Sequence, residues 1–284
     1  MIQAILLPSE FFEINHVDSC YQNEFDALIK SNQFEIYFYD YDTFVSEGIL
    51  KLNKRPNEMT STLLRGWMLN DKNYEIFYNK LLDRNIKLIT TPQEYCNMHL
   101  FPNVYEYIKE DTPKTLVYPE GCDVDLSQIK SCFKKFLIKD YVKSEKGTDF
   151  PTFFDNSISD DEFNRWLKIF KEYRANLFTG GFCIKEFVDL KKYGNCTNEW
   201  RVFYMNKNIV SVSKNSLQPD YVNNVPNELI EKYKNLPSPF YTVDYAELED
   251  ETWKILEAGD GQVSGLSPNQ DAESFFRTIN IIQN

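Results

Sequence analysis

The first hundred residues alternate short apolar runs with amphipathic stretches. Three of the runs have the length and composition of strands, and two stretches between them place apolar residues at helical spacing. The predicted strands cover 2–7, 34–39 and 86–90, and the predicted helices cover 24–30 and 74–82. Pro8 is expected to end the first strand. This alternation predicts a parallel α/β sheet over residues 1 to about 110.

The pattern changes after residue 115. The predicted elements there are a helix at 125–135, a strand at 136–142 and, because it has no apolar period, a mobile polar loop at 143–157. Ser159 and Glu162 have capping-box spacing and precede a helical stripe of large apolar residues. The glycine pair at 180–181 is expected to end that helix.

Five further apolar runs predict β-structure in the rest of the chain. They lie at 182–188, 200–205, 209–213, 240–245 and 253–258. The segment Asn206-Lys207-Asn208 is typical of a hairpin turn, and an acidic turn at 247–251 joins the last two strands. The C-terminal half is therefore predicted to be an antiparallel α+β unit.

Composition narrows the class of protein. The 284 residues are 42% hydrophobic and 26% charged, which suffices for a sizeable core without disulfide or metal staples. A formal charge of −12 argues against general nucleic-acid binding and against anionic membranes. Six scattered cysteines without a CxxC pair argue against structural zinc and fit a reducing compartment. No run has the length of a membrane span or signal sequence, so a cytoplasmic protein is expected.

Two lysines, Lys139 and Lys143, lie four residues apart around the predicted strand 136–142. Residues four apart in a strand point to the same face, so the two ammonium groups suit a polyphosphate ligand. An edge strand with two solvated lysines is the alternative.

Two later strands carry polar side chains that suit a cleft. Lys185 and Glu186 precede an apolar pair and Asp189, and the backbone of such a strand can bind the edge of a purine. Ordinary strand composition explains this segment about as well. Arg201 alternates with Val202, so its side chain can point into a cleft, and a cross-strand salt bridge is the alternative.

Asp244 and Glu257 lie on the two strands of the last predicted hairpin, whose midpoint falls in the acidic turn near residue 250. The two carboxylates are therefore expected to oppose each other. Facing like charges are destabilising unless a cation or strong donor lies between them, and carboxylate oxygens of this kind suit Mg²⁺ bound to phosphates. A solvent-exposed pair without a ligand is the alternative.

These strands follow one another in a fixed order with several shorter segments. The segments are Arg65-Gly66-Trp67-Met68, 91–95, His99, Phe101-Pro102-Asn103, Tyr105, 139–144, 185–187, 199–201 and 257–266. In this order they resemble the ATP-grasp superfamily of ATP-dependent ligases. The resemblance extends to an ATP-grasp branch named for one arginine and two lysines.

The resemblance implies an α/β pre-ATP-grasp domain over residues 1–112 and a two-lobed ATP-grasp domain over 113–284. It implies that Lys139 holds nucleotide phosphates with Lys143 nearby. The segment Lys185, Glu186, Phe187 and Val188 is the implied adenine-binding hinge, and Asp189 is the implied ribose contact.

The resemblance also implies a metal site. Arg201 is expected to face the γ-phosphate or an acyl phosphate, and Asp244 with Glu257 is expected to hold Mg²⁺. Relatives carry an asparagine two residues beyond the metal glutamate, where this chain has Gly259. Asp260 or Gln262 is therefore the candidate for the third metal contact.

The implied activity is that of a cytoplasmic ligase that uses ATP and Mg²⁺ to join a carboxylate to an amine, with small molecules or peptides as substrates. An acyl phosphate is the implied intermediate, and ADP and phosphate are the products. A nucleotide-binding interaction module without catalysis and an ATP-dependent phosphotransferase are the alternatives.

Two residues need separate treatment. Arg65 is expected at the substrate site, where its forked guanidinium suits a carboxylate. An arginine at the end of an element that bridges to an acidic neighbour is the alternative. His99 is the available general base, but beside Leu100 and Phe101 a packed structural histidine is favoured.

Overall fold

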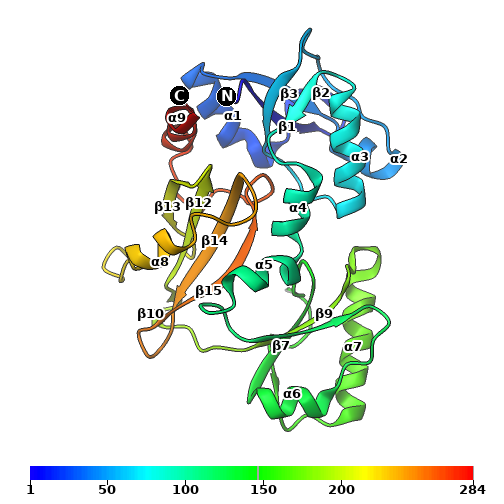
Figure 1. The fold of residues 1–284 in the computed structure, drawn as a ribbon, viewed down its shortest axis with the longest axis vertical. Coiled ribbons are helices and arrows are strands. Elements are labelled where there is room, and N and C mark those ends of the chain that lie inside the picture. Colours follow the sequence, from blue (N-terminus) through cyan, green and yellow to red (C-terminus); the bar gives the residue numbers. More distant parts are fainter. Residues whose placement is uncertain (146, 284) are drawn as a thin grey trace.

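Three sheets of four or five strands form most of the computed structural model, which describes residues 1–145 and 147–283 (Figure 1). A mainly parallel sheet from the N-terminal third lies at one end of the long axis. An antiparallel sheet from residues 115–186 lies at the other end, and a second antiparallel sheet lies between them. The predicted combination of α/β and α+β structure is confirmed. Within the described ranges, no helix has the length and hydropathy of a membrane span.

The N-terminal sheet is built around β1, which has partners on both sides. Its strands are β1 (Ala4–Glu10), β2 (Glu13–Val17), β3 (Glu35–Tyr39), β4 (Thr60–Leu64) and β5 (Ile86–Leu88). β3 and β4 pair with β1 in parallel, β5 pairs with β4 in parallel, and β2 folds back on β1 as a hairpin. The apolar pattern misses β4 because its sequence, TSTLL, has two apolar residues in five.

The prediction that Pro8 ends the first strand is wrong. β1 continues to Glu10, and Pro8 pairs with Tyr39 in the parallel ladder with β3. Proline has no N–H for a ladder, and it is tolerated here because the pairing of β1 with β4 has already ended at Leu6. The carbonyl of Pro8 accepts a hydrogen bond from the Asp18 N–H at 2.9 Å.

Five α-helices and one 3₁₀ turn accompany this sheet. They are η1 (Ser19–Tyr21), α1 (Gln22–Ser31), α2 (Tyr41–Glu47), α3 (Asp71–Leu82), α4 (Pro92–His99) and α5 (Phe101–Ile108). α1 and α3 confirm the predicted helices. Thr91 and Glu94 form a reciprocal capping box at the start of α4, which the sequence prediction did not include. α4 and α5 lead from the N-terminal sheet toward the two antiparallel sheets (Figure 1).

Residues 115–186 form the first lobe, a four-stranded antiparallel sheet covered by two helices. Its elements are β6 (Thr115–Pro119), α6 (Leu126–Cys132), β7 (Lys135–Asp140), β8 (Phe154–Asp155), α7 (Asp160–Arg174), η2 (Ala175–Leu177) and β9 (Gly181–Glu186). The strand order is β6-β9-β7-β8. Phe136, Phe163 and Phe170 lie in the core between the helices and the sheet.

Two predictions for this lobe need correction. The predicted loop 143–157 contains β8 and the buried Phe150, and its residue Lys146 lies outside the described residues. Ser159 caps α7 as predicted, but the helix ends at Arg174, where Ala175 takes a left-handed φ of 44°. Gly181 instead starts β9, directly after Gly180, and a Cβ on Gly181 would lie 2.2 Å from the Tyr118 carbonyl oxygen.

Residues 199–260 form the second lobe, whose sheet has the strand order β13-β12-β14-β15. Its elements are β12 (Glu199–Met205), β13 (Asn208–Lys214), α8 (Asn227–Lys232), β14 (Phe240–Glu247) and β15 (Trp253–Asp260). Both predicted hairpins are confirmed. A bulge between Asp244 and Tyr245 shifts the β14–β15 register and leaves Leu256 without a partner in the ladder. The small hairpin β10 (Lys192–Tyr193) and β11 (Cys196–Thr197) lies in the connection between the lobes.

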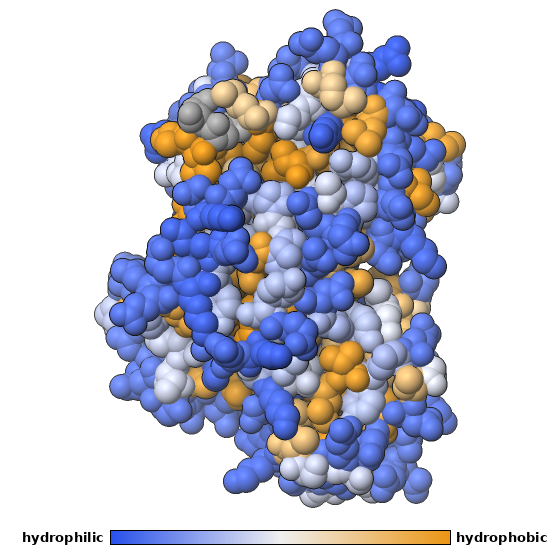
Figure 2. All heavy atoms as spheres, viewed as in Figure 1, coloured by the Kyte–Doolittle hydropathy of each residue, from blue (hydrophilic) through white to orange (hydrophobic). Residues whose placement is uncertain are grey.

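The C-terminal helix α9 (Ala272–Gln283) returns to the N-terminal sheet and lies beside α1 (Figure 1). Phe275 and Phe276 of α9 pack with Phe203 and Phe240 of the second lobe and with Ile5 of β1 in one apolar core. The outer surface on the side shown in Figure 2 is mostly hydrophilic. The predicted boundary between residues 112 and 113 falls between α5 and β6, and the division into two domains stays a prediction.

The β12–β13 turn provides a test of the fold. Asn206 and Lys207 both have positive φ, 47° and 67°, as a two-residue type I′ turn requires. Lys207→Gly should raise the free energy of unfolding by about 1 kcal/mol, because glycine has no Cβ penalty in this region. Lys168→Gly, in the middle of α7, should lower it by about 1 kcal/mol. Urea unfolding of both variants measures this, and destabilisation by Lys207→Gly would contradict the turn assignment.

Candidate active site

A pocket opens where β7 of the first lobe faces β14 and β15 of the second, and the ends of α4 and α5 close one side. Six residues predicted from the sequence line it: Lys139, Lys143, Arg201, Asp244, Glu257 and Asp260. His99, Phe101 and the segment Val263–Gly265 also contribute to the wall. The structure therefore brings together side chains that are more than 100 residues apart in sequence.

Two buried lysines share one aromatic ring at this pocket. The Nζ atoms of Lys139 and Lys185 lie 4.9 Å and 5.0 Å from the centroid of the Phe101 ring. Their strands pair so that Lys139 lies opposite Cys183 and Lys185 lies opposite Leu137, which puts both side chains on the same face of the sheet. The negative face of the ring offsets part of the cost of taking two ammonium groups out of water.

Lys185 is the more constrained of the two lysines. Its Nζ donates a hydrogen bond of 2.6 Å to the carbonyl oxygen of Leu256, the residue that the β-bulge leaves unpaired. Burial, and then the nearby positive charge of Lys139, lower the pKa of Lys185 to about 7. The Lys185 side chain therefore links the first lobe to β15 of the second lobe.

Lys143 reaches the pocket by a different route from the predicted one. β7 ends at Asp140, so Lys143 does not share a strand face with Lys139. A tight turn positions it instead: the buried carboxylate of Asp140 accepts hydrogen bonds from the N–H groups of Val142 and Lys143 at 2.7 and 2.6 Å. Arg174 pairs with the other carboxylate oxygen at 2.9 Å and fixes Asp140.

One row of side chains crosses three neighbouring strands of the second lobe. Arg201 of β12 lies opposite Asp244 of β14, which lies opposite Glu257 of β15. The opposition of Asp244 and Glu257 is the one predicted from the hairpin midpoint. Arg201 binds Asp244 with two hydrogen bonds, Nε to Oδ1 at 2.8 Å and Nη2 to Oδ2 at 2.6 Å. The cross-strand salt bridge considered as the alternative for Arg201 is thus present, and Arg201 still lines the pocket.

The side chain of Glu257 has no hydrogen bond or ion pair with any residue of the two described ranges, although it lines the pocket. Burial would raise the pKa of Glu257, but the surrounding cations outweigh burial and lower it, led by Lys139 and Lys143. The carboxylate is therefore ionised and open to a ligand.

The pair of carboxylates fits a magnesium ion. Mg²⁺ in proteins commonly takes one or two carboxylates and completes its shell with phosphate oxygens and water. Glu257 supplies an unengaged carboxylate directly across from Asp244. Over residues 1–145 and 147–283 no three His, Cys, Asp or Glu side chains are grouped as a metal site, so the ion would need oxygens from a bound ligand.

Asp260 does not join this pair. Strand alternation places it on the opposite face of β15 from Glu257, across from Tyr241. Its Oδ1 accepts hydrogen bonds from the N–H and Nε2 of Gln262 at 3.0 and 3.2 Å. Burial raises the pKa of Asp260 to about 7. The structure thus gives no support to Asp260 or Gln262 as the third contact beside Glu257.

The predicted hinge residues do not line the pocket. The N–H groups of Glu186 and Phe187 bond to the carbonyls of Lys114 and Lys135, and the Phe187 ring packs on Phe153. Asp189 is exposed and lies 3.7 Å from the ammonium group of Lys135. The segment nevertheless occupies the connection between the two lobes.

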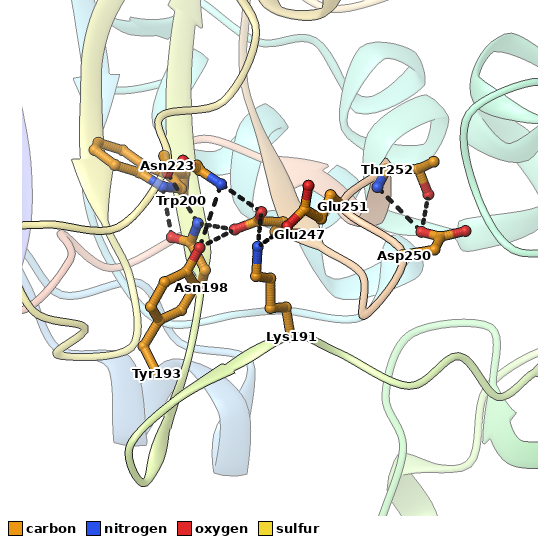
Figure 3. Close-up of polar contacts among 9 residues, drawn as sticks. All are labelled: Lys191, Tyr193, Asn198, Trp200, Asn223, Glu247, Asp250, Glu251 and Thr252. Atoms are coloured by element: carbon orange, nitrogen blue, oxygen red, sulfur yellow. Dashed lines mark hydrogen bonds and ion pairs between the residues drawn. The ribbon is translucent and has the colours of Figure 1, made fainter.

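A buried glutamate that the sequence prediction missed fixes this connection (Figure 3). Glu247 is fully buried in β14 and accepts hydrogen bonds from Lys191, Tyr193, Asn198 and Asn223 at 2.7–3.0 Å. These donors lower the pKa of Glu247, against the effect of burial. Because Lys191, Tyr193 and Asn198 belong to the connection, these hydrogen bonds anchor it to the second lobe. Segment 247–251 is mostly acidic, so the sequence does not indicate that Glu247 is buried while Glu249, Asp250 and Glu251 are exposed.

His99 packs as the structural alternative requires. Its ring stacks on Tyr95 at 4.6 Å between centroids, and Tyr95 stacks on Tyr74 at 3.8 Å. Burial, and then the charge of Lys143, lower the pKa of His99 to about 4. The ring is therefore neutral at physiological pH and forms part of the pocket wall.

Arg65 lies outside the pocket, contrary to its prediction as a substrate-site residue. Its side chain is fully buried, and Nε and Nη2 each bind a carboxylate oxygen of Glu24 at 2.8 Å. Nη1 donates to the carbonyls of Gly261 and Ser264. Arg65 thus follows the end of β4 and pairs with an acidic residue, as the alternative prediction stated.

Comparison with known proteins identifies the arrangement. A family model of the ATP-grasp domain matches residues 127–279, more than half of the chain. The model is that of family 3 in the ATP-grasp clade named for one arginine and two lysines. No curated protein sequence matches.

Solved structures share the whole fold at low identity. The ATP-grasp ligase PsnB, complexed with a phosphomimetic variant of a minimal precursor, Mg and ADP, has a TM-score of 0.60 and 10% identity, over 100% of this chain and 97% of that one. D-alanine–D-alanine ligase from Bacillus anthracis has a TM-score of 0.58 and 13% identity, over 100% of both chains. A RimK domain ATP-grasp protein from Sphaerobacter thermophilus has a TM-score of 0.63 and 10% identity, over 98% of both. At such identities the likeness shows the fold.

Lys185 generates a prediction for stability. Its pKa of about 7 in the folded state lies below the value of 10.5 for an unperturbed lysine, so between these pH values the unfolded state binds more protons. Stability should therefore rise with pH above 7. Lys185→Met should flatten this rise by up to about 1.4 kcal/mol per pH unit in urea unfolding between pH 7 and 9. The exposed Lys192→Met is the control and should keep the wild-type slope. Parallel curves for wild type and Lys185→Met would contradict the prediction.

Proposed function

The chain belongs to family 3 of the ATP-grasp clade named for one arginine and two lysines, and from this premise we propose that it is an ATP-dependent ligase that joins a carboxylate to an amine. One observation carries the proposal. The row formed by Arg201, Asp244 and Glu257 in the second lobe lies in the same pocket as Lys139 and Lys143 of the first. Cations and an unengaged carboxylate around one pocket suit a metal-bound nucleotide.

The lysines are proposed to hold the nucleotide phosphates. Lys139 and Lys143 line the pocket, and Lys185 lies behind them with its ammonium group already desolvated. A phosphate group would gain strong charge-assisted hydrogen bonds from such groups because little water has to be removed. The segment 186–189 remains the proposed adenine and ribose contact, since it joins the two lobes next to Lys185.

Glu257 and Asp244 are proposed to hold Mg²⁺, which would offset charge on the phosphate oxygens when bound. Asp244 is held by Arg201, so its position does not depend on the ion. Arg201 would remain beside the transferring phosphoryl group. The proposal omits Asp260, which faces away from Glu257.

In the proposed reaction a substrate carboxylate oxygen attacks the γ-phosphorus of ATP, the bond from that phosphorus to ADP breaks, and an acyl phosphate forms. The neutral amine then attacks the acyl carbon, the bond from that carbon to the phosphate oxygen breaks, and the proton lost by the amine passes to the departing phosphate as the amide forms. Lys139 and Arg201 would offset negative charge in the first step. Arg201 would do the same for the departing phosphate.

The similar structures support the proposed classes of substrate. The PsnB complexes contain a precursor, Mg and ADP, and the name of the Bacillus anthracis enzyme specifies ligation of two alanines. We therefore propose amino acids or peptides as the carboxylate and amine. The six cysteines are all free thiols, which supports a reducing cytoplasmic location.

Nucleotide binding tests the lysine assignment. Lys139→Ala should lose at least about 2 kcal/mol of ATP affinity, roughly 30-fold, because a phosphate-paired charge disappears from a buried site. Isothermal titration with Mg-ATP measures the change. Lys192→Ala, exposed on β10, is the matched control and should bind like the wild type. Equal affinities in Lys139→Ala and wild type would overturn the assignment.

Product analysis tests the chemistry. With ATP, Mg²⁺ and a panel of amino acids and peptides, hydroxylamine should trap the acyl phosphate as a hydroxamate, and ADP should form without AMP. Glu257→Gln should slow ADP release by about a hundredfold or more, with a smaller loss of ATP affinity. Asp244→Asn combined with Glu257→Gln should abolish turnover, and Glu249→Gln in the exposed turn should not change it.

The outcomes separate the rival functions. A nucleotide-binding interaction module would bind ATP and release no ADP with any acid. A phosphotransferase would give a phosphorylated product that survives without an amine. AMP among the products, or full activity in the Asp244→Asn, Glu257→Gln double variant, would contradict the ligase mechanism.

A further inference from the structure

Arg65 is the largest side chain among the fully buried residues, and it joins elements that are distant in sequence. It follows β4 in the N-terminal sheet, and its partner Glu24 lies on α1. Its remaining nitrogen, Nη1, binds the carbonyl oxygens of Gly261 and Ser264 in the segment that follows β15. The side chain therefore ties the N-terminal sheet to a segment of the pocket wall.

The same segment is held from its other side by a second arginine. Nη1 of Arg201 donates a hydrogen bond of 2.9 Å to the carbonyl oxygen of Gly265, the residue next to Ser264. The Ser264 hydroxyl also bonds to that of Thr242 on β14, at 2.9 Å. Two guanidinium groups from different sheets thus bind adjacent carbonyls of one short segment, residues 261–265.

The surroundings of Arg65 leave little freedom to move. The centre of its guanidinium lies 5.6 Å from the ring centroids of both Phe203 and Phe275. Removing one member of a buried ion pair leaves an uncompensated charge, which is strongly unfavourable. Arg65 therefore has one position, defined by Glu24 and two aromatic rings.

These contacts form an unbroken path from α1 to the carboxylate proposed as a metal ligand. The path runs from Glu24 to Arg65, through the Ser264 and Gly265 carbonyls to Arg201, and on to Asp244. A shift of segment 261–265 would move the acceptor of Arg201 and, with it, the donors that hold Asp244.

We propose that Arg65 is a positioning residue for the metal site, acting through segment 261–265 and the Arg201–Asp244 pair. The inference rests on the proposed function, because it concerns the Mg²⁺ held by Asp244 and Glu257. Arg65 itself does not line the pocket and reaches it only through the carbonyls of segment 261–265. Its effect should therefore fall on the metal-dependent part of nucleotide binding.

Arg65→Lys isolates this effect. A lysine keeps the positive charge beside Glu24, but its single ammonium group cannot reproduce the planar fork that binds Glu24 and two carbonyls together. The matched control is Arg84→Lys, because Arg84 also binds two carbonyls, those of Lys80 and Leu50, within the N-terminal part of the chain and away from the pocket.

The experiment is isothermal titration of ADP into the full chain with excess Mg²⁺ and, separately, with EDTA. In the wild type Mg²⁺ should increase ADP affinity. In Arg65→Lys the ratio of ADP affinity with Mg²⁺ to ADP affinity in EDTA should be at least fivefold smaller than in the wild type. Its ADP affinity in EDTA should stay within twofold of the wild-type value. Arg84→Lys should keep both values. An Arg65→Lys protein with the full Mg²⁺ effect would overturn the proposal.

A measurement on the wild type does not depend on the folding of any variant. Hydrogen exchange should show that Mg-ADP protects segment 261–266 and also residues 21–31 and 60–66, which lie away from the nucleotide pocket. ADP in EDTA should not protect residues 21–31. Unchanged exchange of residues 21–31 and 60–66 with Mg-ADP would overturn the proposal. Absence of ADP binding in the wild type would instead contradict the proposed function.

Discussion

Charges that are taken out of water around one pocket have to balance, and most features of this molecule follow from that requirement. Lys139, Lys185 and Arg201 are all largely withdrawn from solvent, and Asp244 with Glu257 supplies the opposite charge. Arg201 and Asp244 neutralise each other in a bidentate pair, so Glu257 alone faces the lysines. The pocket without a ligand therefore has more cations than anions. A polyphosphate with its metal ion brings the charges closer to balance, which is why the site suits such a ligand.

The same requirement shapes the connections between the parts of the molecule. Three buried carboxylates outside the pocket join segments that are distant in sequence. Glu24 binds Arg65, Asp140 binds Arg174 beside the turn that carries Lys143, and Glu247 gathers four donors around the connection between the lobes (Figure 3). A buried carboxylate tolerates few alternative partners, so these pairs specify where neighbouring segments meet. The shared apolar core of β1, β12 and α9 stabilises the contact between these elements, but apolar contacts specify the position of each segment less strictly than the buried ion pairs do.

Local patterns in the sequence predicted the elements and much of the pocket. The opposition of Asp244 and Glu257 follows from the turn between their strands, because an antiparallel register is set locally. Lys139 and Arg201 were predicted from strand periodicity, which is equally local, whereas Lys185 was predicted only as part of a strand segment suited to a purine. The partnership of Arg65 with Glu24 spans 41 residues, and no pattern along the chain indicates it. The end of α7 was misplaced because Ala175 takes a positive φ, which is usually left to glycine. Glu247 resembles its exposed acidic neighbours in every respect except its position in the fold.

The bulge in the last hairpin has a consequence for the energetics of binding. By leaving Leu256 out of the ladder, it exposes a carbonyl oxygen to which Lys185 is already bound. A phosphate that recruits Lys185 must compete with an internal acceptor that occupies the same ammonium group. The free energy of association is then the difference between two hydrogen bonds and not the sum of new ones. In the absence of a nucleotide, the hydrogen bond to the hairpin keeps the Lys185 ammonium group ordered. A phosphate oxygen can replace the Leu256 carbonyl only if it binds this ammonium group more strongly than the carbonyl does.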